Sequence, residues 1–465
     1  MKRILGITLG IVLVLLLVMS VALADEEKQS GAFTYRIKGN GTAVITGYDW
    51  ENYQYDWESD QGEDIYIPRM VDGYTVTEIG EFAFSAFYFD DNGNPEISDD
   101  KFEICIMAVS IVIPDTITTI GKGAFFGIRS ASKAINIPAS VEYIGDGAFS
   151  YIDGVEQFTV GTQNPVYATI DGVLFNKKEK ALIAFPHNKQ RITKDTSRAT
   201  TYYTIPDGIT TIANYACYGF NPTDVMGRKL IDVVVFPETI TSIGNYSFAY
   251  ANITTDTNGQ DLVLPKSVSQ LGVGAFREAN KEYHMDGKTI DLGLTSLHEI
   301  PDYAFYGTCV DSVIFPKQVE TIGAYAFSEC KRNRLAKFFI PSSVKTIKEG
   351  AFSSKDFCAS FEFEEGSQLQ TIGDCAFEGT SVIGNKEFVL PSGLKDIGKS
   401  AFKNCEYLEI LTIPASVTSI GKDVCTRESV YLNVEPGSYA ALWASENGYM
   451  TTGTGAEDTS WLTAP

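Results

Sequence analysis

The hydrophobic positions of the chain follow one phrase that recurs along most of its length. It occurs as IVIPDTITTIGKGAFFG from Ile111, INIPASVEYIGDGAFS from Ile135, LVLPKSVSQLGVGAF from Leu262 and LTIPASVTSIGKDVC from Leu411. Counted from the Pro, apolar residues stand at +3 and +6, Gly at +7, Ala at +10 and Phe at +11. Recurrence at intervals of about 23–30 residues predicts a solenoid of stacked coils.

Each phrase begins with two apolar residues that enclose a variable one, as in Val313 and Phe315 before Pro316. This alternation predicts a short strand whose apolar residues point inward, and the Pro ends it because it has no N–H to donate to the next ladder. The Gly permits a turn that a side chain would hinder, and the Ala-Phe pair fills the interior from the opposite side. A single coil cannot bury these residues alone, so a β-rich solenoid with a parallel sheet is predicted.

The Phe of the phrase predicts an aromatic core. Equivalent side chains of successive coils lie about 4.8 Å apart along a parallel sheet, so their rings are expected to stack. We expect one continuous buried ladder formed by Phe125, Phe149, Phe276, Phe327, Phe352, Phe377 and Phe402.

The variable residue between the two inward positions of each strand is expected to point to solvent. The row of these middle residues, six of them apolar, is Val112, Asn136, Thr204, Val235, Val263, Gly293, Ile314, Phe339, Glu362, Val389 and Thr412. The row is either a contact surface or a consequence of Val and Ile suiting strands. As candidate partner-binding residues we take Ile314 and Phe339, expected about 5 Å apart on adjacent coils, together with Val263 and Val389.

The IPxxVxxIGxxAF phrase resembles the BspA-like class of bacterial leucine-rich-repeat proteins, over roughly residues 62–435. The resemblance implies leucine-rich-repeat coils in a secreted or surface-attached protein, often assigned to adhesion. It therefore implies a non-catalytic binding or adhesion protein whose partner is a host, matrix or bacterial surface protein, with a glycan as the alternative ligand. A second hypothesis is a wall-associated structural scaffold without a specific soluble ligand.

Regions outside the repeat predict the domain organisation, with the solenoid itself over 68–435. Alternating residues on either side of Gly39-Asn40-Gly41 predict a hairpin in an N-terminal β cap. Asp171-Gly172 between short apolar stretches predicts a hairpin insertion, and apolar residues at helical spacing after Ser438 predict a short capping helix. The expected segments are the cap at 25–67, the insertion near 155–200, the capping helix at 436–450 and a flexible tail at 451–465.

The N-terminus has the layout of a secretory signal peptide over residues 1–24. Lys2-Arg3 precedes an apolar run, and Ala22-Leu23-Ala24 forms a small-residue cleavage site. The alternative is an uncleaved membrane anchor, for which the run is short. No later segment is long and apolar enough to span a membrane, so we expect a secreted or extracellular protein, either free or associated with the cell surface.

Charge and cysteine usage limit the partners further. Removal of the signal peptide would leave 35 basic against 59 acidic residues, a formal charge of −24. Nucleic acid is therefore not an expected partner, because polyanion binding requires clustered Lys and Arg. Cys217 and Cys425 take the Phe position of their repeats, and Cys330 and Cys405 follow that position by three residues. They are interpreted as small buried residues, although pairing of some cysteines stays open.

Motifs for chemistry are weak, and no catalytic, cofactor-binding or metal-binding residue is predicted. Residues 393–400, GLKDIGKS, match the P-loop pattern, but Leu394 and Ile397 are the +3 and +6 core residues of a repeat. The three histidines lack a second ligand at a useful spacing. The run Asp90-Asp91-Asn92-Gly93 resembles the start of a calcium loop, but Pro95 stands where Gly is needed.

Overall fold

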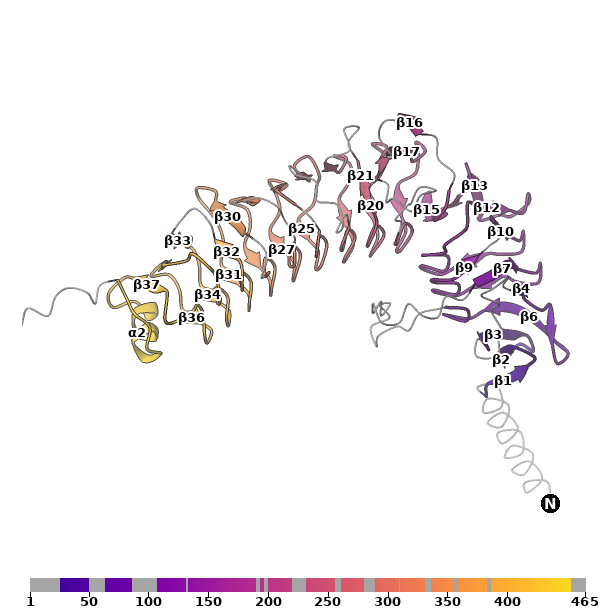
Figure 1. The fold of residues 1–465 in the computed structure, drawn as a ribbon, viewed down its shortest axis with the longest axis horizontal. Coiled ribbons are helices and arrows are strands. Elements are labelled where there is room, and N and C mark those ends of the chain that lie inside the picture. The colour runs from indigo at the N-terminus through magenta and orange to yellow at the C-terminus, as the bar shows by residue number, and fades with distance from the viewer. Residues whose placement is uncertain are drawn as a thin grey trace, which may run out of the picture. The chain divides into compact units, whose positions relative to one another are not determined.

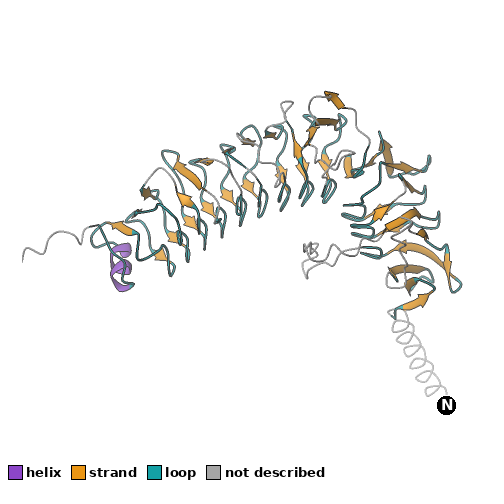
Figure 2. Cartoon of the chain, in the orientation of Figure 1, coloured by secondary structure: helices purple, strands orange, loops and turns teal. Residues whose placement is uncertain are grey.

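A computed structural model describes residues 26–49, 63–85, 107–130, 133–189, 193–195, 200–219, 231–255, 261–279, 289–308, 310–330, 336–354, 358–382 and 386–452. The predicted signal peptide at 1–24, the calcium-like run at 90–95, Cys105, His284, Cys309 and the tail after residue 452 lie outside these ranges. The chain divides into two compact units, Met1–Gln190 with Ala213–Tyr218, and Arg191–Ile212 with Gly219–Pro465. Each unit consists of stacked coils (Figures 1 and 2).

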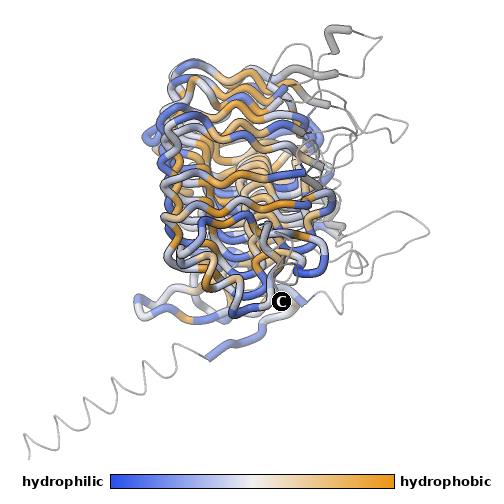
Figure 3. The backbone as a smooth tube through the Cα atoms, turned by 90° about the vertical axis from the view of Figure 1, so that its left-hand side faces the viewer, coloured by the Kyte–Doolittle hydropathy of each residue, from blue (hydrophilic) through white to orange (hydrophobic). Residues whose placement is uncertain are grey.

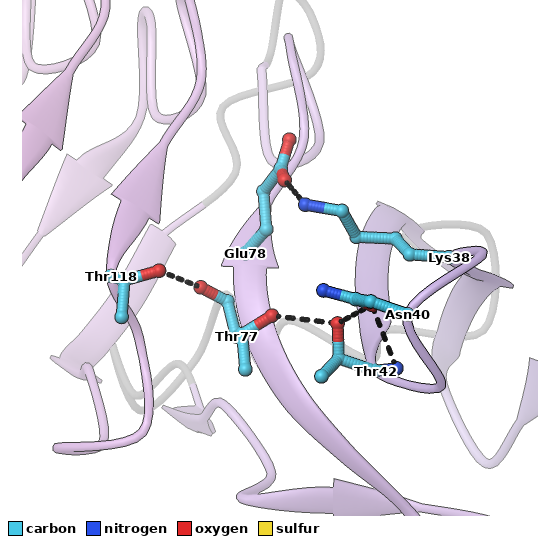
Figure 4. A network of polar contacts seen from close by, with 6 residues as sticks. All are labelled: Lys38, Asn40, Thr42, Thr77, Glu78 and Thr118. Carbon is cyan, nitrogen blue, oxygen red and sulfur yellow. Dashed lines mark hydrogen bonds and ion pairs between the residues drawn. The ribbon is translucent and has the colours of Figure 1, made fainter.

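The first unit begins with an antiparallel cap, as the sequence predicted. Its strands are β1 (Lys28–Ser30), β2 (Phe33–Ile37) and β3 (Ala43–Tyr48). Strand β3 then pairs in parallel with the first coil through β6 (Tyr74–Ile79). Side chains tie the cap to the coils, because Thr77 Oγ1 donates to Thr42 Oγ1 (3.1 Å) and Lys38 Nζ lies 2.5 Å from Glu78 Oε2 (Figure 4).

Parallel pairing organises the coils of the first unit. One side of each coil carries the strands of a first ladder, and these strands are β4 (Glu63–Tyr66), β7 (Met107–Val112), β9 (Arg129–Ser130), β10 (Ala134–Ile137) and β12 (Gln157–Val160). A second side carries short strands after β6, namely β8 (Thr119–Ile120) and β11 (Tyr143–Ile144), and β5 (Met70–Val71) forms a hairpin with β6. Parallel pairing thus already includes Glu63–Tyr66, within the stretch assigned to the cap.

An antiparallel meander interrupts the coils of the first unit. Its strands are β13 (Tyr167–Ile170), β14 (Val173–Asn176) and β15 (Ala181–Ala184). Before it, β12 still pairs in parallel with β10, so residues 157–160 belong to a coil. Asn164 joins coil and meander. Its Nδ2 donates to the carbonyls of Pro138 and Val141 (both 2.9 Å), and its Oδ1 accepts the N–H groups of Val166 and Tyr167 (2.8 and 2.7 Å).

The second unit repeats the two-sided pattern over more coils. Its strands on the first side are β16 (Thr193–Asp195), β17 (Thr200–Thr204), β19 (Ile231–Val235), β21 (Ile253–Thr254), β22 (Leu262–Val263), β24 (Thr289–Asp291), β26 (Ser312–Ile314), β28 (Ala336–Ile340), β30 (Cys358–Phe363), β32 (Ser381–Val382), β33 (Glu387–Val389), β35 (Ile410–Ile413) and β37 (Tyr431–Val434). Its short strands are β18 (Thr211–Ile212), β20 (Ser242–Ile243), β23 (Gln270–Leu271), β25 (Glu299–Ile300), β27 (Thr321–Ile322), β29 (Thr346–Ile347), β31 (Thr371–Ile372), β34 (Asp396–Ile397) and β36 (Ser419–Ile420). Apart from the β16–β17 hairpin, neighbouring strands are parallel. The predicted parallel solenoid is confirmed.

Phenylalanine rings form the core on the third side of each coil. Successive rings stack with centroids 5.1–5.6 Å apart. A single ladder was predicted, but the stacked rings form one run in each unit. The run of the first unit is Phe84, Phe125 and Phe149. The run of the second unit is Phe248, Phe276, Phe305, Phe327, Phe352, Phe377 and Phe402. Cys217 takes the equivalent position among residues 213–218. Hydrophobic segments recur at matching places of successive coils (Figure 3).

The Gly that follows the short strand is required by close packing of backbones. A Cβ atom at Gly398 would lie 2.3 Å from Asp374 N and 2.4 Å from Gly373 C, both in the preceding coil. This Gly has no positive φ, unlike the glycine of a left-handed turn. The Gly was predicted to permit a turn, and this reason was wrong. The position requires Gly because the absence of a side chain lets one coil approach the next.

Two residues after this Gly, the chain turns through the left-handed region. The position holds Gly350 (φ 58) in one coil and Tyr325 (φ 55) in the coil before it. A Cβ atom at Gly350 would lie 2.3 Å from the Tyr325 ring, so the tyrosine covers the glycine. Phe82 and Tyr246 cover Gly123 and Gly274 in the same way.

The variant Gly350→Ala is expected to lower the free energy of unfolding by about 2 to 3 kcal/mol, because backbone strain and overpacking add. Gly366→Ala is the matched control, since Gly366 also has a positive φ (77) but a Cβ atom there would meet no heavy atom within 4 Å. It is expected to lose only about 1 kcal/mol. Denaturant unfolding measures both, and equal losses would contradict the packing of Tyr325 on Gly350.

A helix and a strand-like segment close the C-terminal end. Ser438 caps α2 (Tyr439–Glu446) by accepting the Ala441 N–H, and Trp443 is buried. Leu432 of β37 pairs with Thr451, which occupies the outer edge of that strand. The predicted helical cap is therefore confirmed. No helix within the described ranges is long and apolar enough to cross a bilayer.

Candidate partner-binding face

The middle residues of four neighbouring strands form a row on the outer face of the second unit. Asp291 on β24 pairs with Ile314 on β26, and Phe339 on β28 pairs with Glu362 on β30. Strands β26 and β28 are joined at Val313 and Phe338, which places Ile314 beside Phe339. The order across the sheet is thus Asp291, Ile314, Phe339, Glu362.

Exposure confirms the phase of these strands. Ile314 is 49% exposed and Phe339 is 52% exposed. Val313 and Phe338, which precede them in their strands, point to the core and are buried. Phe338 packs on the aromatic ladder, with its ring centroid 5.1 Å from that of Phe352. Ile314 and Phe339 are therefore outward residues on adjacent coils.

Leu294 is a third exposed apolar residue, in the turn that begins beside Ile314. The side chain of Leu294 is 74% exposed, and it follows Gly293, where a Cβ atom would lie 2.7 Å from Ile314 Cγ2. The backbone at Gly293 thus rests against Ile314. We call Leu294, Ile314 and Phe339 the apolar patch.

One member of the predicted row was wrong. In the parallel ladder it is Asp291, not Gly293, that pairs with Val263 and with Ile314. Ile290 and Leu292 are the buried pair of this strand, so Gly293 takes the place that Pro holds in other repeats. The row therefore carries a carboxylate next to Ile314.

The two other candidate residues lie apart from the patch. Val263 on β22 is outward but is separated from Ile314 by Asp291. Val389 on β33 is 57% exposed and belongs to another sheet, where it pairs with Thr412. The structure thus brings together only Ile314 and Phe339 of the four.

The short-strand side offers an internal comparison. Its outward residues in the same coils are all polar, namely Glu299, Thr321, Thr346, Thr371, Asp396 and Ser419. Both sides are parallel ladders of one solenoid, so a general preference of strands for Val, Ile and Phe would act on both. On the short-strand side this preference is met by Thr, so strand preference does not by itself require apolar side chains at outward positions.

Charged groups surround the patch. Asp291 Oδ1 accepts the Gly293 N–H (2.9 Å), and Glu362 is exposed on the opposite side. Glu364 Oε2 accepts the Ser342 N–H (2.8 Å), and this hydrogen bond lowers the pKa of the Glu364 carboxyl. Lys337 is exposed two residues before Phe339, on the same face of β28.

Cysteines and threonines share one structural position. Among the described cysteines, Cys217, Cys330, Cys375, Cys405 and Cys425 are not in disulfides. The Cys405 thiol donates to the Phe377 carbonyl of the preceding coil (3.1 Å), and the Thr380 hydroxyl donates likewise to the Phe352 carbonyl (2.5 Å). Burial raises the pKa of the Cys405 thiol. These side chains therefore satisfy buried carbonyls between coils.

The segment that matches the P-loop pattern has the geometry of an ordinary repeat. Leu394 and Ile397 are buried, Gly398 lies against the preceding coil, and Ser400 is a buried left-handed residue. Turn and short strand, not a helix, follow the glycines. Within the described parts of the chain, no three His, Cys, Asp or Glu side chains gather as a metal site would require.

Solved structures similar to the chain include a leucine-rich repeat protein from Eubacterium ventriosum (18% identity, TM-score 0.45, covering 77% of this chain and 95% of that one). Others are a leucine rich cell surface protein from Faecalibacterium prausnitzii (20%, TM-score 0.35, 73% and 95%) and a leucine-rich repeat protein from Bacteroides ovatus (16%, TM-score 0.38, 88% and 99%). A search of curated proteins by sequence gave no match.

The model of the BspA type leucine rich repeat region, which contains 6 copies, matches residues 63–163, 95–221, 226–285 and 296–430. These ranges cover most of the chain and include the strands that carry the apolar patch. The chain therefore belongs to the BspA-type leucine-rich-repeat family.

Proposed function

We propose that this chain is a non-catalytic, secreted or surface-located binding protein that presents the apolar patch to a protein on a host or bacterial surface. The observation that supports this function is the exposure of the neighbouring side chains Ile314 and Phe339, with Leu294 also exposed, in a unit whose outward short-strand residues are polar. Exposed apolar side chains that gather on a soluble protein are typical of contact surfaces.

The support beneath the patch suits binding. Ile314 and Phe339 stand on paired strands whose inner residues are locked against the aromatic ladder. A partner would thus meet strands whose backbone is already held in place, which limits the entropy lost on association. Because the patch holds one aromatic ring among aliphatic groups, a protein fits it better than a glycan does.

The double variant Ile314→Ser, Phe339→Ser is expected to fold with little loss of stability and to lose partner binding by more than about 30-fold. The loss follows from removing two central apolar contacts while leaving the core intact. A partner is first captured from bacterial or host surface proteins and identified. Its affinity for parent and variant is then measured with purified proteins.

The control is Thr321→Ser, Thr346→Ser, an outward pair on adjacent short strands. It should bind like the parent, because it changes half-buried side chains on the other ladder, away from the apolar patch. Equal affinity of the parent and the Ile314→Ser, Phe339→Ser variant would show that the patch is not the contact surface.

A further inference from the structure

The carboxylates beside the apolar patch indicate the chemistry of the partner. We infer that the patch takes an extended segment of a basic protein, with an apolar side chain between Ile314 and Phe339 and a Lys or Arg on either side of it. The two cationic groups would meet Asp291 and Glu362. This inference rests on the proposed function, since it names the partner class of the same surface.

The spacing of the four residues sets the length of that segment. Asp291, Ile314, Phe339 and Glu362 follow one another on neighbouring parallel strands, in one outward row. Strands in a sheet are about 4.8 Å apart, so the two carboxyl-bearing positions are separated by roughly 14 Å. The apolar pair lies midway between them.

An extended chain matches this distance. It advances about 3.4 Å per residue, and residues i, i+2 and i+4 point to the same face. Residues i and i+4 are thus about 14 Å apart, with residue i+2 midway. The recognition pattern is therefore basic, any, apolar, any, basic, lying across the strands.

Charge on the same face favours a cationic partner over other occupants. Glu364 and Glu365 follow Glu362 just after the end of β30, whereas Lys337 before Phe339 and Lys317 near Glu364 add two positive charges. The whole chain has a formal charge of −22, which repels a second copy and attracts basic proteins over longer distances. Anionic polymers and anionic membranes are disfavoured for the same reason.

The test uses immobilised peptides that carry Lys-Ser-Phe-Ser-Lys, Glu-Ser-Phe-Ser-Glu, Lys-Ser-Ser-Ser-Lys or the longer spacing Lys-Ser-Ser-Phe-Ser-Ser-Lys, probed with the full chain. We expect the first to bind most strongly. Asp291→Asn with Glu362→Gln should weaken its binding about fivefold, since each exposed ion pair contributes little. Asn retains an acceptor for the Gly293 N–H, so this variant should fold normally.

A gain-of-binding variant and a matched control complete the design. Lys337→Glu should strengthen binding of the first peptide about threefold, because it removes a repelling charge. Asp396→Asn with Glu428→Gln makes the same change in net charge as the double carboxylate variant at exposed positions away from the patch, and should leave binding unchanged.

The outcomes separate this inference from the proposed function. Equal binding of all four peptides, or of the parent and the Asp291→Asn, Glu362→Gln variant, would overturn the inference. If a captured partner still required Ile314 and Phe339 in that case, the proposed function would stand. If the partner bound normally to the Ile314→Ser, Phe339→Ser variant, both would fall.

Discussion

Replacement of Phe377 by Ala is expected to lower the free energy of unfolding of the second unit by about 3 to 5 kcal/mol. The Phe377 ring is fully buried and is stacked between those of Phe352 (5.3 Å) and Phe402 (5.1 Å). Phe361 also meets it edge to face at 5.0 Å. Because these neighbours are fixed by their own coils, the space left by the ring cannot close completely, and a cavity remains.

Denaturant unfolding followed by tryptophan fluorescence and by hydrogen exchange measures this loss, and hydrogen exchange locates it along the coils. The matched control is Phe339→Ala, which removes the same group from an exposed position and should cost less than about 1 kcal/mol. Phe327→Ala tests a second central rung. If Phe327→Ala and Phe377→Ala both unfolded like the parent, the register of the aromatic ladder would be wrong.

Replacement of Asn164 by Ala is expected to destabilise the first unit by about 3 to 5 kcal/mol. Asn164 is buried, and its amide satisfies two carbonyls of one turn and two N–H groups at the start of the meander. Ala would leave these four backbone groups without that partner in the interior. Thermal unfolding and proteolysis between residues 160 and 190 report the loss.

Two further variants define the role of the Asn164 amide. Asn164→Asp keeps an acceptor for Val166 and Tyr167 but cannot donate to Pro138 and Val141, so it should also be destabilised. Asn136→Ala is the control, because Asn136 is exposed and accepts one hydrogen bond from Thr159 (3.1 Å). A parent-like Asn164→Ala protein would show that the meander is held by its strands alone.

The sequence predicted the coil because each repeated position has its own structural role. The pattern of two apolar residues that enclose a variable one predicted which side chains of β26 and β28 point inward. The Phe position of the repeat predicted the stacked core. The phase was wrong only where a repeat lacks its Pro. There, Gly293 stands in the Pro position, and only the apolar pair Ile290 and Leu292 could have indicated that Asp291 points outward.

Contacts between coils could not be predicted from the pattern of a single repeat. The close approach of Gly398 to Asp374 depends on the neighbouring coil, and so does the hydrogen bond from Cys405 to the Phe377 carbonyl. A signal for the second was present, because Thr308, Thr380, Cys330 and Cys405 all follow the repeat Phe by three residues. Their shared ability to donate a hydrogen bond, rather than their size, unites them.

The candidate site was predicted in part. Alternation alone identified Ile314 and Phe339, whereas Leu294 was missed because it lies in a turn that has no repeat pattern. Val263 and Val389 were correctly expected to be outward. They do not join the patch, because Asp291 separates Val263 from Ile314 and because Val389 belongs to another sheet.

The closed C-terminal edge has a consequence for assembly. A parallel sheet that ends in an open strand can recruit a strand from another molecule and grow into fibres. Here Leu432 is already bonded to residues 450–452, since its N–H donates to Met450 and its carbonyl accepts from Thr452. At the other end, the outermost strand of the described residues is the three-residue β1, which is too short to template a long ladder. Many copies can therefore be concentrated at one location without pairing edge to edge. Each molecule then keeps its own exposed row of side chains.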